Sequence, residues 1–468
     1  MSNNLLLLIA DLLILGGLYL LGAAVVIAIL GKADRIALLS LGLGVGAGIL
    51  SWSMFLASWA GIPLTAGTVL GLYAVLTVAG VILARRTSKA DSVDKLIVAS
   101  PRGELDSRLT RGSWILIVLL ILAAAILGVG LSYFGWDDIT NWALKAYGIA
   151  LEGSIFAGRE WGAVGLSYPM NITLLIALFR ILDGNLLPGS KLLYPAFYAA
   201  LLLGCYSFWV MHGLKRWVAS LCSLLLATTP IIFTHAYMGY TNLAFTFYLI
   251  MGLIWCLKSM EVRGTREALL GGLMLAVGLW TRPEGYVMCI AVIVALVLGS
   301  ILRAQASYHW LAALIPLAMI GGPWFSFLRM QPASDTASYG LVGVAWRGML
   351  AGQIHWSALF TILRFVAGQV LRFRDWGFVP ALMGGLTLLG FRPNALRRDT
   401  VYGILLFATL TIGLALLGFQ YVVAYAPAAP GVYEWLSLEF SRVGMPAVVS
   451  LTLLGSLSLR EKGSEPRT

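Results

Sequence analysis

The chain has 468 residues, of which 60% are apolar and only 11% are charged. Its mean hydropathy of +0.89 is far above that of soluble globular domains, so the composition excludes a soluble protein and predicts an integral membrane protein surrounded by lipid. The formal charge of +11 is typical of basic cytoplasmic loops rather than of a nucleic-acid surface. Nucleic acid is therefore excluded as a partner.

Three apolar runs open the sequence, each long enough for the roughly 20 residues of a membrane span. They are Leu5 to Leu30, Ile36 to Ala60 and Leu64 to Ala84. Lys32 and Arg35 follow the first run, and because basic loops stay in the cytoplasm, the N-terminus is expected outside. Residues 1–84 are therefore predicted to form three spans, and the polar stretch 85–112 is predicted to be a cytoplasmic linker.

Alternate glycines occupy the middle of the second run, from Gly42 to Gly48. The spacing looks superficially like a nucleotide-binding loop, but the glycines lie inside a span, with no strand and no acidic partner. Small residues within a span let two helices approach closely. We interpret this run as a helix-packing surface.

Ten further spans are expected between residues 113 and 460, because most inward ends of the apolar runs carry basic residues. These runs are Ser113 to Phe134, Lys191 to His212, Trp217 to Thr234, Thr241 to Leu257, Glu267 to Trp280, Tyr286 to Leu302, Trp310 to Leu328, Trp376 to Leu389, Thr400 to Val423 and Met445 to Leu459. The prediction is an all-α polytopic protein of thirteen spans with a short cytoplasmic tail at 461–468.

Two long outer loops are expected, at about 135–190 and about 329–375. Each contains a stretch predicted to form a helix at the membrane surface, Ile172 to Leu182 in the first and the amphipathic Trp356 to Leu371 in the second. Charges in a bilayer protein are costly unless they are paired, hydrated or functional. The charged residues of the outer loops and turns are therefore the candidates for chemistry.

Two adjacent carboxylates, Asp137 and Asp138, open the first outer loop directly after Trp136. They could simply begin a solvated helix, since acidic side chains suit a helix N-terminus. Alternatively, a carboxylate at the membrane boundary with a like charge beside it becomes a stronger base, able to take the proton of an acceptor hydroxyl. Lys145 and Tyr168 follow in the same loop and are candidates for substrate contacts.

Arg282 lies in a tight outer turn of sequence Thr-Arg-Pro-Glu-Gly that also contains Glu284. Its guanidinium could merely anchor the turn at the interface, or it could bind a phosphate, for which the planar fork is suited. Arg442 lies with Glu434 and Glu439 before the last span. The first loop, this turn and the region of Arg442 can form one site only if the bundle brings their spans together.

Together these motifs resemble the GT-C superfamily, polytopic glycosyltransferases that include protein O-mannosyltransferases and lipid A aminoarabinose transferases. The resemblance is carried by Gly-Trp-Asp-Asp at 135–138, by Tyr-Pro at 168–169 and by the Thr-Arg-Pro-Glu-Gly turn. It covers about residues 111–460. What it implies is a GT-C-like catalytic core at 113–460, preceded by three additional helices.

The resemblance also implies roles for individual residues. The acidic motif of the family maps onto Asp137 and Asp138, with the first as the catalytic base. The basic residue of the family's turn maps onto Arg282, near the phosphate of the lipid donor. Arg442 resembles a late basic motif of bacterial members and is the second candidate for binding that phosphate.

Two features depart from the family pattern. Many members have an Asp after the aromatic residue at the outer end of the span where this chain reads Gly-Tyr-Thr-Asn at 239–242, which weakens the argument for a metal site. Tyr240, Asn242 and Glu284 are kept as candidates for the substrate pocket. The three N-terminal spans precede the usual start of the fold and have no expected role.

The expected function is inverting transfer of a sugar from a polyprenyl-phosphate donor to a glycan, lipid or protein acceptor on the outer face of the plasma (inner) membrane. No metal is expected to be obligatory, although a divalent cation could take part. The alternative is a transporter or flippase of lipid-linked sugars, which predicts charges near mid-span and internal symmetry. A scaffold without catalysis would leave the outer charges unexplained.

Overall fold

The structure, a computed structural model, is all-α in the part of the chain that it describes. The described residues are 2–90, 104–131, 133, 135, 137–161, 165–166, 168–184, 189–301, 308–332, 351–352, 355–370, 372–390, 403–413, 442 and 444–459. Expectations for Trp136, for Glu434 and Glu439, for the middle of the second outer loop and for the tail 461–468 lie outside these residues.

The helices fall into two groups along the chain, one up to Asp183 and one from Gly189 onward. The first group, which includes the helices of the predicted first outer loop, contains α1 (Ser2–Leu30), α2 (Arg35–Trp59), α3 (Ala66–Ala90), α4 (Glu104–Gly130), the π-helix η1 (Asp138–Ala143), α5 (Leu144–Glu152), η2 (Ile155–Ala157), α6 (Gly158–Trp161) and α7 (Asn171–Asp183). The second group contains η3 (Gly189–Leu192), α8 (Leu193–Met211), α9 (Arg216–Ala227), α10 (Pro230–His235), α11 (Asn242–Val262), α12 (Thr265–Leu279), α13 (Gly285–Ile301), η4 (His309–Ala313), α14 (Leu314–Arg329), α16 (Trp356–Val370), α17 (Phe373–Trp376), α18 (Val379–Gly390) and α21 (Met445–Leu457).

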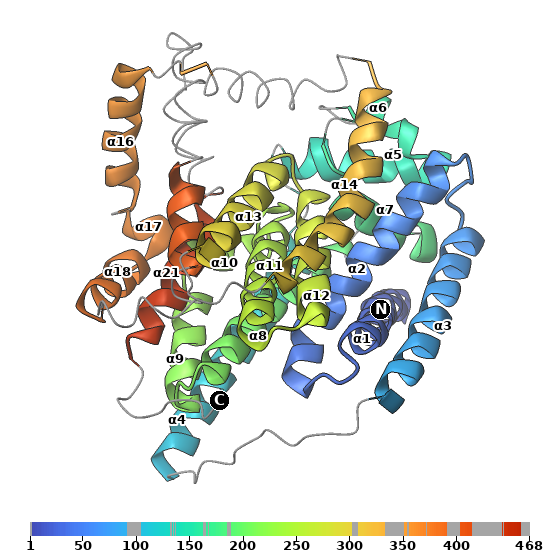
Figure 1. The fold of residues 1–468 in the computed structure, drawn as a ribbon. Helices are drawn as coiled ribbons and strands as arrows, with labels where there is room; N and C mark the ends of the chain where they lie inside the picture. Colours follow the sequence, from blue (N-terminus) through green and yellow to red (C-terminus); the bar gives the residue numbers. More distant parts are fainter. Residues whose placement is uncertain are drawn as a thin grey trace.

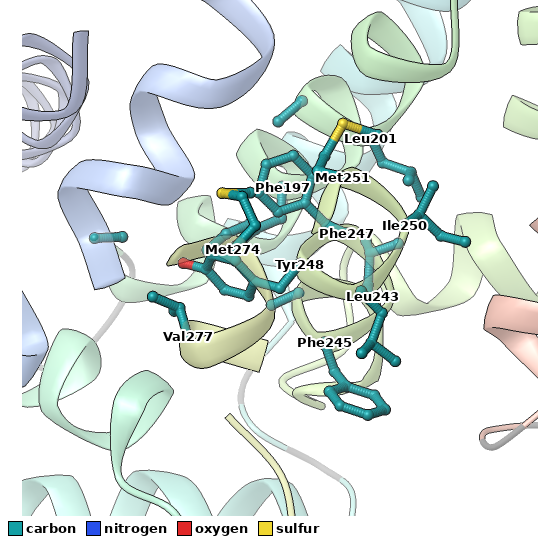
Figure 2. Packing of buried hydrophobic residues seen from close by; sticks show 14 of the residues in the cluster. Phe197, Leu201, Leu243, Phe245, Phe247, Tyr248, Ile250, Met251, Met274 and Val277 are labelled. Atoms are coloured by element: carbon teal, nitrogen blue, oxygen red, sulfur yellow. The ribbon is translucent and has the colours of Figure 1, made fainter. Parts of the chain in front are cut away.

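The centre of the bundle is α11, with α2, α8 and α12 packed around it (Figure 1). Figure 2 shows why: aromatic and aliphatic side chains project from several sides of α11, including Phe247, Tyr248 and Met251, and meet residues of the neighbouring helices such as Phe197. A helix that is apolar all round must be buried or must face lipid. α3 lies at one side of the bundle, and α16 and α18 lie at the opposite side (Figure 1).

The glycine run of the second span packs helices together, as predicted. A Cβ on Gly46 would collide with the carbonyl oxygen of Leu18 in α1, while one on Gly44 would meet the ring of Phe247 in α11. Glycine therefore brings α2 into close contact with two helices on different sides. The interpretation of the run as a packing surface is confirmed.

Seven described helices are long and apolar enough to cross a membrane, and several shorter apolar helices accompany them. The seven coincide with predicted spans, so the protein is an all-α membrane protein. Helix extends into both ends of the linker expected at 85–112, since α3 continues to Ala90 and α4 begins at Glu104.

Two predicted helices differ from their expected form. The run expected to span from Trp217 to Thr234 is broken: α9 ends at Ala227 and α10 begins at Pro230. Proline lacks the N–H that continues a helix and clashes with the preceding turn. The predicted surface helix at 172–182 exists as α7, but its side chains are buried from Asn171 to Phe179. α7 is thus an internal element packed against α2 and α5 rather than a helix lying on lipid.

Candidate functional site

The short connection between α10 and α11 is the centre of the candidate site. We call its residues, Gly239 to Asn242, the hub segment. Three of the predicted site residues converge on it from separate parts of the chain, as the contacts described below establish. The segment is the same stretch that departs from the family pattern in sequence.

Asp137 and Arg442 form an ion pair although 305 positions separate them. The Arg442 Nη1 donates to Asp137 Oδ2 at 3.0 Å, and Asn141 Nδ2 donates to Asp137 Oδ1 at 3.0 Å. The Arg442 guanidinium also stacks over the ring of Tyr240, 4.5 Å from its centroid. The pair is partly exposed: 13% of the Arg442 side chain and 33% of the Asp137 side chain are accessible.

Asp138 has a different environment from its neighbour. Its side chain is fully buried and pairs with the buried Lys191 at 3.4 Å. The backbone N–H of Gly239 donates to Asp138 Oδ2 at 3.2 Å, and a Cβ on Gly239 would collide with the carboxylate. The Lys191 ammonium lies 4.4 Å from the ring centroid of Tyr133. Asp138 therefore fixes one end of the hub segment.

The two adjacent carboxylates have separate partners, instead of forming the like-charge pair considered from the sequence. Each aspartate has its own cation, Arg442 for Asp137 and Lys191 for Asp138. Each also accepts a hydrogen bond from a separate neutral donor. The two carboxylates thus act in different places, one at the accessible surface of the cluster and one inside it.

Arg282 holds the other end of the hub segment. Its Nε and Nη2 donate to the two oxygens of Glu284, both at 3.0 Å, in a bidentate pair. Its Nη1 donates to Asn242 Oδ1 at 2.9 Å and lies 3.4 Å from Thr241 Oγ1. Arg282 as a whole is only 6% exposed. Planar donors in this arrangement fix the helix start of α11 relative to the turn at 281–285.

Lys145 and Tyr168 belong to the inner face of the loop helices. Lys145 is completely buried in α5, with its alkyl chain packed near Gly158, and the ring of Tyr168 meets that of Trp142 edge-on at 5.4 Å. In the part of the chain that the structure describes, Lys145 Nζ has no hydrogen-bond partner. Burial lowers the pKa of Lys145 to about 7, because a desolvated ammonium loses its hydration.

A stability measurement can test the state of Lys145. Between about pH 7 and about pH 10 the unfolded chain binds a proton that the folded chain does not hold, so stability should rise with pH in this window. Replacing the lysine by methionine removes a buried polar group that costs about 1–3 kcal/mol. We expect Lys145→Met to raise the thermal midpoint at pH 7 and to lose the rise with pH. Melting curves in detergent at pH 6, 7, 8 and 9 check this, and an unchanged pH profile would contradict it.

His235 also belongs to the cluster, although it is part of no sequence motif. Its Nδ1 lies 2.9 Å from the carbonyl oxygen of Ile231, which assigns the proton to Nδ1 and leaves Nε2 as an acceptor. Burial, with smaller contributions from Arg442 and Arg282, lowers the pKa of His235 to about 4. The ring lies against Tyr240, with centroids 5.9 Å apart. His235 is thus a buried, neutral ring within the cluster.

Two buried ionisable residues lie outside the predicted motifs. Lys191 begins a predicted span, and Asp11 lies within the first apolar run. Asp11 is fully buried, and a Cβ on Gly189 would collide with its carboxylate. A signal for both existed, since an ionisable residue in an apolar run is costly and marks a partner or a function.

The structure brings most predicted site residues together. The cluster around the hub segment contains Asp137, Asp138, Tyr240, Asn242, Arg282, Glu284 and Arg442. No protein-family model matches the chain, and no curated protein matches it. The functional argument therefore depends on the chemistry of this cluster.

Proposed function

We propose that the protein is a membrane glycosyltransferase of GT-C-like architecture with thirteen spans. It takes a sugar from a polyprenyl-phosphate donor and transfers it, with inversion, to an acceptor on the outer face of the plasma (inner) membrane. Asp137 is the catalytic base, Arg442 and Arg282 bind the donor phosphate, and Asp138 is a positioning residue. The acceptor is a glycan, a lipid or a protein.

The observation that supports the proposal most is the accessible pair of Asp137 and Arg442 over Tyr240. Glycosyl transfer needs a base for the acceptor hydroxyl and a positive group for the charge that develops on the leaving phosphate. This pair places both kinds of group 3.0 Å apart, and Arg282 adds a second guanidinium through the hub segment.

The pair also suggests an order of events. Before the donor binds, Arg442 Nη1 pairs with Asp137 Oδ2 and holds that carboxylate oxygen. The donor phosphate competes for Arg442 and leaves Asp137 available to the acceptor hydroxyl. The acceptor oxygen then attacks the anomeric carbon as its proton passes to Asp137. The bond from that carbon to the phosphate oxygen breaks, and its electron pair stays on the phosphate, beside the guanidinium groups.

Transport is the weaker alternative for this chain. A transporter is expected to carry its substrate site near the midplane, between repeats. The clustered charges here lie in the turns and loops that join helices, at η1, at the hub segment and at the turn after α12. This arrangement favours chemistry at the membrane surface.

The direct test is turnover by the purified protein. The protein is incubated in detergent with a panel of polyprenyl-phosphate sugars and a mixture of acceptors, and the lipids are analysed by mass spectrometry. We expect one donor to be consumed and polyprenyl phosphate to be released. The Asp137→Asn variant is the matched control. Movement of lipid-linked sugar across vesicles with no loss of sugar from the lipid would instead support the transporter.

Catalysis should persist without a metal. The oxygens of Asp137 and Asp138 are directed to different partners, Arg442 and Lys191, so the pair does not present several ligands to one divalent cation as such ions require. We expect turnover after exhaustive EDTA treatment to remain within about twofold of the untreated rate, a change of under 0.5 kcal/mol in the barrier. Loss of activity in EDTA with rescue by magnesium, manganese or calcium would overturn this expectation.

A further inference from the structure

The helix α2 contacts the turn that carries Arg282 through aromatic rings. Trp280, two residues before Arg282, lies edge-on to Trp52 with centroids 4.9 Å apart and is tilted against Phe55 at 4.7 Å. Trp52 and Phe55 both belong to α2. An N-terminal helix with no expected role is therefore in direct contact with the candidate site's supporting turn.

A chain of hydrogen bonds joins the same elements. Ser51 Oγ in α2 donates to Asn171 Oδ1 in α7 at 2.6 Å, and Asn171 Nδ2 donates to Thr281 Oγ1 at 2.8 Å. Thr281 Oγ1 in turn donates to the carbonyl oxygen of Val277 at 2.6 Å. At the other end, Trp280 Nε1 lies 3.4 Å from Ser51 Oγ. Both ends of this series of hydrogen bonds lie in the segment 277–281, which leads directly to Arg282.

The directions of the two hydrogen bonds that the Asn171 side chain makes are fixed, while the Ser51 hydroxyl also lies 3.1 Å from the carbonyl oxygen of Gly48. Val277 offers only a carbonyl, so the Thr281 hydroxyl donates there and accepts from the amide of Asn171. The amide oxygen must then face Ser51. Ser51, Asn171 and Thr281 are all fully buried, and a buried polar network in which every member is satisfied holds one arrangement rigidly.

We propose that Ser51 and Asn171 are positioning residues that, through Thr281, fix the turn from which Arg282 binds the donor phosphate. This proposal rests on the function proposed above, because the phosphate role of Arg282 is part of that function. It gives α2 a part in donor binding. Thr281 is the adjacent residue, so a rotation of its backbone changes the direction of the guanidinium.

The experiment compares two variants that break the chain with matched controls. Ser51→Ala and Thr281→Val each remove one hydroxyl, while Thr281→Ser keeps it. Ser40→Ala removes a buried hydroxyl from the same helix, where it bonds only to the carbonyl of Ala37. Two quantities are measured on the folded protein: binding of a short polyprenyl monophosphate in detergent, and hydrogen exchange of the backbone amides of residues 280–285.

We expect Ser51→Ala and Thr281→Val to weaken binding of the lipid phosphate by about tenfold, the effect of one buried group left unsatisfied. Exchange at 280–285 should become faster in both. Thr281→Ser and Ser40→Ala should stay within about twofold of the wild type, a range that surface or isolated changes rarely exceed. A purely structural role would lower the thermal midpoint without this selective loss of binding.

The outcomes separate this proposal from the proposed function. If Arg282→Ala abolishes lipid-phosphate binding while Ser51→Ala binds normally and exchanges normally, the positioning role is refuted and the function stands. If the wild type binds no polyprenyl phosphate, the proposed function fails and the donor-binding role of Ser51 and Asn171 fails with it. In that case, the rate of amide hydrogen exchange at residues 280–285 in the Ser51→Ala variant still shows whether α2 fixes the turn.

Discussion

Asp137→Asn should reduce turnover by about 10²–10⁴-fold, the usual contribution of a positioned general base. The amide keeps the shape of the carboxylate and can still accept a hydrogen bond from Asn141, but it cannot take a proton from an acceptor hydroxyl. It also releases Arg442 from its ion pair. We therefore expect donor binding to survive or improve while the chemical step is lost. Single-turnover rates and lipid-phosphate affinity, measured on the same preparation, check both parts.

Asp138→Asn is the matched control, since it changes the neighbouring residue in the same way. It removes the carboxylate that pairs with the buried Lys191, and breaking a buried ion pair costs about 3–5 kcal/mol. We expect a large loss of thermal stability, and the double variant with Lys191→Met should recover it. Asp137→Asn should melt like the wild type. A folded Asp137→Asn protein with normal turnover would refute the base assignment.

Arg282→Ala should weaken donor binding by more than about 30-fold, because it removes a buried charge together with its bonds to Asn242 and Glu284. Arg282→Lys should keep part of the affinity, since an ammonium supplies the charge without the planar fork. Titration of each variant with a short polyprenyl monophosphate measures the change. The control is Arg180→Ala, which removes a guanidinium that lies over the ring of Tyr147 instead of over Tyr240.

A second variant distinguishes a phosphate ligand from an anchor. In the structure Glu284 occupies the bidentate face of Arg282. If the donor phosphate takes that face, Glu284→Gln removes a competing charge and should tighten lipid-phosphate binding. An anchoring arginine predicts the opposite, an unchanged or weaker affinity because the turn loses its ion pair. Normal binding by Arg282→Ala would move the phosphate site to Arg442.

The apolar runs predicted the helices because run length and helix length have the same cause, the need to satisfy the backbone within lipid. The glycine run predicted close packing for the same kind of local reason. The break before Pro230 was also readable, since proline has no amide hydrogen to continue a helix. The prediction of one continuous span at 217–234 was wrong because apolar length alone does not detect a break that a single proline causes.

The roles of the two aspartates could not be separated from sequence. Neighbours on a helix point about 100° apart, so adjacency in sequence does not place two carboxylates in one site. The fold sends Asp137 to Arg442 and Asp138 to Lys191. These partners can be identified only from the three-dimensional packing of η1 against the hub segment. Local patterns do not encode contacts between positions 305 residues apart.

The buried pair of Asp138 and Lys191 has a consequence for membrane insertion during synthesis. Lys191 stands at the outer end of a predicted span, where a positive charge opposes the usual orientation of membrane helices. Asp138 precedes it by 53 residues, so the nascent chain delivers the carboxylate first. The lysine then arrives at a partner already present. In Asp138→Asn, we expect ribosome-coupled insertion of α8 to yield a fraction of inverted chains.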